Sequence, residues 1–101
     1  MNASLYLPNQ PPRAVPAAGL SLPSPAGYAQ VTDEVAAYLG CVRDLVDVLD
    51  CGPDYVAYSV FDCEGPTNQG AMNALEAVSG NRYDLNDDDQ VLQGPVLLVT
   101  R

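Results

Sequence analysis

Residues 55–63 read Tyr-Val-Ala-Tyr-Ser-Val-Phe-Asp-Cys, and this stretch decides the fold. Aromatic and β-branched residues, which favour strands, fill most of it. Side chains alternate between the two faces of a strand, so one face receives Tyr55, Ala57, Ser59 and Phe61, and the other receives Val56, Tyr58 and Val60. Because both faces carry apolar side chains, we expect an interior strand of a sheet.

The residues after this strand predict a turn and then a helix. Residues 63–70 are rich in Gly, Pro and Asn, a composition typical of turns. Asn68 is a suitable N-cap for a helix over residues 69–79, and Gly80 is a suitable end for it. The buried stripe of this helix is expected to contain Ala71, Met72, Leu75 and Val78.

A second strand is expected over residues 90–100, broken or bulged at Gly94-Pro95. Its residues 96–99 are continuously apolar. A sheet of only two strands has marginal stability, so a third strand must come from the N-terminal segment or from a second copy of the chain. A homodimer that pairs residues 96–99 across a two-fold axis would complete the sheet.

The segment before the first strand has the spacing of a helix over residues 32–51. Its apolar positions recur three or four residues apart and are Val35, Leu39, Val42, Val46 and Leu49. Thr32 is a suitable N-cap, and Gly52-Pro53 is a strong stop signal. Gly40 is unfavourable inside a helix, by about 1 kcal/mol relative to Ala. The alternative is a helix that ends at Gly40, followed by a strand over residues 45–49.

The N-terminal segment, residues 1–29, differs in composition from the rest. It contains Pro8, Pro11, Pro12, Pro16, Pro23 and Pro25. Proline removes a backbone donor and blocks helix, so this segment predicts a flexible arm or an extended strap anchored by Leu20 and Leu22. Residues 4–7 could form a short edge strand. We therefore expect a Pro-rich arm over residues 1–29 and an acidic α+β domain over residues 30–101, with two helices on one face of a two- to three-stranded sheet.

Acidic residues dominate the charge of the chain. It has thirteen Asp and Glu, four Arg and neither Lys nor His, for a formal net charge of -9. Nucleic acids and anionic membranes are bound by cationic side chains that displace counterions, so we expect neither as a partner. No stretch is apolar enough to span a bilayer or has the pattern of a secretory signal, and we expect a cytoplasmic protein.

The residue types that catalysis needs are scarce. Without His or Lys, nothing activates a serine or the thiols of Cys41, Cys51 and Cys63 as nucleophiles. Three widely spaced cysteines predict free thiols rather than a disulfide framework or a zinc site. The paired carboxylates of Asp62 and Glu64 are interpreted as a polar strand end. We therefore expect no enzymatic activity, no metal and no cofactor.

Two acidic groups are the candidate partner-binding residues. Asp44, Asp47 and Asp50 recur every three residues and would form a ridge on the predicted helix, which Asp54 extends. The second group is a loop that contains Asp84, Asp87, Asp88 and Asp89. This loop begins like a calcium-binding loop, but its sixth and twelfth positions lack the required Gly and Glu. The ridge is either a solvated helix face, a partner for Arg and Lys, or an imitation of a row of phosphates.

Three short pieces between residues 54 and 100 carry a resemblance to a known family. They are Phe61-Asp62-Cys63-Glu64-Gly65, Asn68-Gln69-Gly70-Ala71 and Gly94-Pro95-Val96-Leu97-Leu98-Val99. Their order is similar to that in an uncharacterised family of small phage and plasmid proteins, known as a domain of unknown function. The resemblance implies an origin in a mobile genetic element and carries over no catalytic residues.

The function expected from these observations is that of a non-enzymatic, phage-type accessory protein. It would bind and occlude a host protein with a basic surface, because its carboxylates attract cationic side chains. The alternatives are a nucleic-acid mimic that inhibits a DNA-binding protein, and a self-assembling structural module.

Overall fold

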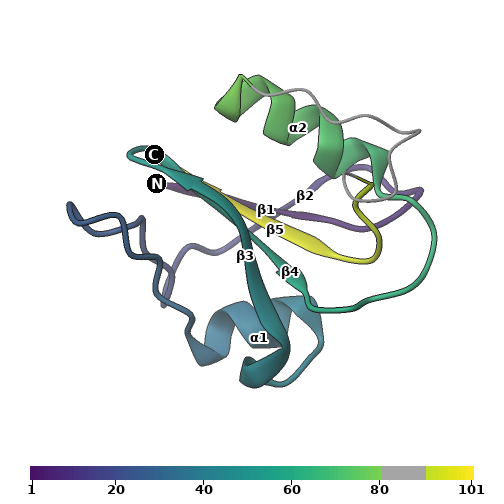
Figure 1. Cartoon of the computed structure of the whole chain (residues 1–101), viewed down its shortest axis with the longest axis horizontal. Helices are drawn as coiled ribbons and strands as arrows, with labels where there is room; N and C mark the ends of the chain where they lie inside the picture. Colours follow the sequence, from purple (N-terminus) through teal and green to yellow (C-terminus); the bar gives the residue numbers. More distant parts are fainter. Residues whose placement is uncertain (81–90) are drawn as a thin grey trace.

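The computed structural model describes residues 1–80 and 91–101, which form one antiparallel sheet and two α-helices (Figure 1). In chain order the elements are β1 (Asn2–Tyr6), β2 (Arg13–Val15), α1 (Asp33–Leu39), a 3-10 turn (Arg43–Leu45), β3 (Val46–Gly52), β4 (Tyr55–Val60), α2 (Gln69–Ser79) and β5 (Val96–Thr100). The five strands lie in the order β2-β1-β5-β4-β3. The α+β class is confirmed, but the sheet is larger than the predicted two or three strands.

The two helices lie on opposite faces of the sheet, whereas the sequence analysis placed them on one face (Figure 1). The α1 face buries the main core, which includes Ala3, Leu5, Leu20, Val35, Leu39, Val56, Tyr58, Leu97 and Val99. The α2 face buries a smaller cluster of Ala57, Leu75 and Leu98. β4 and β5 carry apolar side chains on both of their faces. Both sets are buried because each strand lies inside the sheet, which is covered on both sides.

The two strands best marked in the sequence are interior strands. β4 lies between β3 and β5, as its two apolar faces predicted. β5 pairs with β1 on one side and with β4 on the other, in registers that include Ala3↔Val99 and Val56↔Val99. Both edges of β5 are therefore occupied within the chain. Of the two expected sources of a further strand, the N-terminal segment is confirmed, and no edge of residues 96–99 is left for a second copy.

The N-terminal segment belongs to the sheet and is not a separate arm. β1 is an interior strand, and β2 is the edge strand beside it. The later part of the segment is irregular and crosses the α1 face as the expected strap, with Leu20 buried and Leu22 packed against the core. Two side chains tie the strap to the domain, since the Tyr58 hydroxyl donates to the Gln30 carbonyl at 3.0 Å and the Tyr38 hydroxyl to the Pro16 carbonyl at 3.1 Å.

The long helix predicted over residues 32–51 is wrong. The alternative of a helix that ends at Gly40 and then a strand is confirmed, although the strand spans Val46–Gly52 and not residues 45–49. Thr32 caps α1 by accepting a hydrogen bond from the Val35 N–H, but the helix stops at Leu39. Gly40 takes a left-handed conformation with φ 73°, and its N–H closes the helix onto the carbonyls of Ala36 and Ala37. The chain then forms β3, whose backbone is hydrogen-bonded to β4. A helix over the same residues would not make these inter-strand hydrogen bonds.

The second helix follows the sequence closely. α2 spans Gln69–Ser79 with Asn68 as its N-cap and Gly80 as its left-handed C-cap. Ala71, Met72 and Leu75 are buried as predicted, whereas Val78 is 38% exposed. Asn68 is itself 1% exposed, and this burial gives it a structural role beyond capping.

Candidate functional site

The two edges of the sheet differ in their capacity to accept another strand. β2 has three residues and is flanked by Pro12 and Pro16, which lack the N–H that strand pairing needs. β3 has seven residues, and no proline interrupts it before Pro53. Proline at the edge of a sheet hinders pairing with a further strand, so the β2 edge is protected and the β3 edge is open.

The main chain of β3 presents free groups on its outer side. The Phe61 N–H donates to the Leu45 carbonyl at 2.7 Å, and Asp47 lies opposite Ser59 in the ladder. In an antiparallel pair, residues alternate between groups that point toward the partner strand and groups that point away. Asp47 therefore points its N–H and C=O toward β4, whereas Val48 points both of its groups away from the sheet. The Val46 carbonyl also points outward, but the Val46 N–H donates to the Arg43 carbonyl and closes the 3-10 turn.

The side chains of β3 divide by chemistry between the two faces of the sheet. Val46 and Val48 lie opposite Val60 and Tyr58, which face α1. Asp47 and Asp50 lie opposite Ser59 and Ala57, which face α2. Residues three apart in a regular strand face opposite sides, but the register shifts between Val48 and Asp50. This bulge brings the two carboxylates to one face.

The predicted acidic ridge is thus replaced by a different arrangement of the same residues. Asp44 lies in the 3-10 turn before β3, and Asp47 is exposed on the strand. Asp50 is half-buried and accepts a hydrogen bond from the Tyr55 hydroxyl at 2.9 Å. Asp54 lies in the β3–β4 turn and pairs with Arg101 at 2.9 Å. The remaining predicted residues, Asp84, Asp87, Asp88 and Asp89, lie outside the described residues.

Exposed apolar side chains adjoin the acidic edge and were missed by the sequence analysis. Val42, Leu45 and Phe61 are 64%, 42% and 63% exposed. Val42 was assigned to the buried stripe of the long helix, and Phe61 to a strand that in fact ends at Val60. The hydrogen bond from the Phe61 N–H to the Leu45 carbonyl brings these two residues together. Exposed aromatic and aliphatic side chains are typical of the centre of a protein-binding surface, and polar side chains are typical of its rim.

A hollow of about 500 Å³ lies on the α2 side of this edge. Its lining includes Asp47, Leu49, Ser59, Phe61, Asp62 and Leu92. Asp47 and Asp62 place two carboxylates on its walls, and Phe61 supplies an aromatic ring. A cavity of this composition fits the end of a cationic side chain, whose aliphatic stem packs on apolar atoms while its charge meets the carboxylates.

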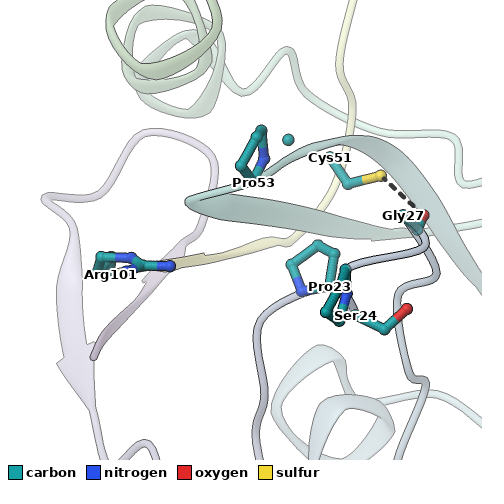
Figure 2. Close-up of a pocket in the computed structure, with 8 residues that line it drawn as sticks. Pro23, Ser24, Gly27, Cys51, Pro53 and Arg101 are labelled. Carbon is teal, nitrogen blue, oxygen red and sulfur yellow. Dashed lines mark hydrogen bonds between the residues drawn. The ribbon is translucent and has the colours of Figure 1, made fainter.

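A second hollow, of about 450 Å³, opens between the N-terminal strap and the β3–β4 turn (Figure 2). It is lined by Pro23, Ser24, Pro25, Gly27, Cys51, Gly52, Pro53 and Arg101. The Cys51 sulfur points toward the Gly27 carbonyl at 3.9 Å, and Arg101 lies at the other end of the pocket. Among the described residues that line this pocket, none is a general base that could activate the thiol.

The cysteines are free and half-buried, as predicted. Burial raises the pKa of the Cys41 thiol, and the nearby Cys63 raises it further. A raised pKa reduces the thiolate fraction, which is the reactive form. Among residues 1–80 and 91–101, no group of three or more acidic or cysteine side chains is placed to hold a metal ion.

The chain matches no known protein family, no curated protein and no solved structure. The resemblance to small phage and plasmid proteins therefore stays a prediction. In the part of the chain that the structure describes, no helix has the length and apolar character needed to cross a membrane.

Proposed function

We propose that this protein is a non-enzymatic binding module that occludes a basic surface on a partner protein. As a phage-type accessory protein it would act in the cytoplasm of the host cell. The observation that carries this proposal is the placement of Asp47 and Asp50 on one face of an open edge strand, beside exposed Leu45 and Phe61. The carboxylates steer a cationic partner, and the apolar side chains supply contact area once water leaves.

The charge of the whole chain supports the same partner. A net charge of -9 on 101 residues gives a field that attracts cationic surfaces over about 8 Å at physiological salt. The ion pairs that the structure describes, Arg43–Asp33 and Arg101–Asp54, join exposed groups and leave Asp44 and Asp47 out. Exposed pairs of this kind are weak, so they neutralise little of the field.

No specific observation favours either of the two alternative functions. A nucleic-acid mimic would use carboxylates spaced like phosphates along a ridge, and the predicted helical ridge is not formed. A self-assembling module would use the C-terminal strand, and β1 and β4 occupy both of its edges. Occlusion of a basic protein surface remains the function that the exposed edge supports best.

Affinity capture from a host lysate tests the proposal. The variant Asp44→Asn/Asp47→Asn/Asp50→Asn should capture at least about tenfold less partner than wild type, because it removes the steering charges. Capture by wild type should also fall as salt rises. The matched control is Asp33→Asn/Glu34→Gln/Glu64→Gln, which removes the same charge from exposed positions elsewhere. Equal loss in both variants would assign the effect to net charge and contradict a local site.

A further inference from the structure

We propose that β3 binds the partner by strand addition, and that the added segment alternates cationic and apolar side chains. This inference rests on the function proposed above and specifies how the partner is recognised. The partner's main chain would bond to the outward N–H and C=O of Val48 and to the outward C=O of Val46, since the Val46 N–H already donates to the Arg43 carbonyl. Edge strands recruit extended peptides in this way, with the main chain giving affinity and the side chains giving specificity.

The side-chain pattern of the segment follows from the two faces of β3. A strand that pairs with β3 sends successive side chains to opposite faces of the sheet. On the α1 face these side chains meet Val46 and Val48, and on the α2 face they meet Asp47 and Asp50. Aliphatic residues complement the first face, and Arg or Lys complements the second.

The hollow beside Asp47 strengthens the choice of a cationic residue. Its lining combines the carboxylates of Asp47 and Asp62 with the exposed ring of Phe61. A guanidinium there would pair with a carboxylate and stack on the ring, whereas an acidic or aliphatic side chain would leave the carboxylates unpaired. Arg is therefore the residue that this part of the edge fits best.

A second copy of the chain is the rival occupant, and charge disfavours it. Pairing β3 with β3 of another copy would place Asp44, Asp47 and Asp50 beside their counterparts, and like charges across a strand pair repel. The chain has no Lys with which to relieve this repulsion. The same carboxylates that exclude a second copy attract a basic strand, so one set of residues provides both effects.

The test uses a peptide of alternating Arg and Val with capped ends, matched to the seven residues of β3. Titration into the isotopically labelled protein at low salt should shift the resonances of β3 and slow amide exchange at Val48 by at least about tenfold. Asp47→Asn/Asp50→Asn should weaken binding about tenfold. The control Asp33→Asn/Glu34→Gln should change it by less than about twofold.

Two further measurements separate strand addition from simple charge attraction. A peptide with N-methyl groups on alternate amides keeps its charge but cannot pair, and it should bind at least about tenfold more weakly. Val48→Pro removes an outward donor, keeps every carboxylate, and should weaken the unmodified peptide to the same extent. The N-methylated peptide needs no change to the protein, so it gives a result even if the proline variant fails to fold.

Each contrary result has a defined meaning. Equal binding of the N-methylated and unmodified peptides, or no binding of either, overturns strand addition. Sedimentation that shows a dimer abolished by Val48→Pro overturns the assigned occupant in favour of a second copy. If lysate capture still depends on Asp44, Asp47 and Asp50, the proposed function survives these outcomes; if capture does not, the function fails as well.

Discussion

Asn68→Ala should lower the free energy of unfolding by about 3–5 kcal/mol, the largest effect of any single change considered for this protein. The Asn68 carboxamide donates to the Tyr6 carbonyl at 2.9 Å and to the Gly94 carbonyl at 2.8 Å. Its oxygen accepts from the Ala71 N–H at 3.2 Å and caps α2. One buried side chain thus joins the end of β1, the start of β5 and α2, and alanine would leave buried groups unpartnered.

Urea denaturation of three variants measures this effect. Asn73→Ala is the matched control, because Asn73 is exposed on the same helix and its loss should change stability by less than about 0.5 kcal/mol. Asn68→Asp keeps the capping oxygen but turns a carboxylate toward two carbonyl oxygens, so it should destabilise at least as much as alanine. A loss below about 1 kcal/mol for Asn68→Ala would show that the carboxamide does not join the three elements.

Gly94→Ala should cost about 2–3 kcal/mol of stability, because it combines backbone strain with a steric contact. Gly94 has φ 73°, and an added Cβ would lie 2.5 Å from the Cys63 sulfur. Gly40→Ala is a matched control with the same φ of 73° and nothing within 4 Å of the added Cβ. It should cost only the strain, about 1 kcal/mol.

Thermal or chemical unfolding of both glycine variants isolates the contact with Cys63. The double variant Cys63→Ala/Gly94→Ala removes the sulfur and should recover the difference between the two glycine substitutions. Equal losses for Gly40→Ala and Gly94→Ala, with no recovery in the double variant, would contradict the close approach of Cys63 to Gly94. Both predictions probe the same junction, where the loop before α2 meets the start of β5.

The sequence predicts elements best where local signals agree. Residues 69–79 have a cap, an apolar stripe and a terminal glycine, and the helix spans these residues. Residues 55–60 have strand formers on both faces, and β4 is an interior strand. In both segments, residue propensity, hydrophobic pattern and boundary residues favour the same structure, and the tertiary contacts agree with it.

Prediction fails where two periodicities share the same residues. Val42, Val46 and Leu49 fit a helix, but Val46, Asp47 and Val48 also alternate as a strand. Long-range pairing with β4 decides between them, and a single sequence does not contain that information. The N-terminal segment was predicted in part, since the short edge strand expected at residues 4–7 is the interior strand β1, and β2 was not expected. Prolines near both strands hide them in the sequence, and they form by pairing β1 with β5 and β2 with β1.

The candidate site was predicted in part. Asp44, Asp47 and Asp50 were chosen for their charge and spacing, and the structure places Asp44 in the 3-10 turn and both Asp47 and Asp50 on β3. What the sequence did not reveal is the bulge after Val48, which brings Asp47 and Asp50 to the same face. Nor did it reveal the exposure of Phe61, because the end of a strand depends on backbone conformation, here φ 54° at Asp62.

The open edge of β3 is the central claim, and amide hydrogen exchange in the free protein tests it most directly. The Val48 N–H points away from β4, so it should exchange at a nearly unprotected rate. The Val46 N–H donates to the Arg43 carbonyl and is left out of the test. The Asp47 N–H points toward Ser59 and should exchange more slowly, by on the order of 100-fold. Protection of Val48 equal to that of Asp47 would show that the edge is already covered, and the proposed mode of binding would have no site.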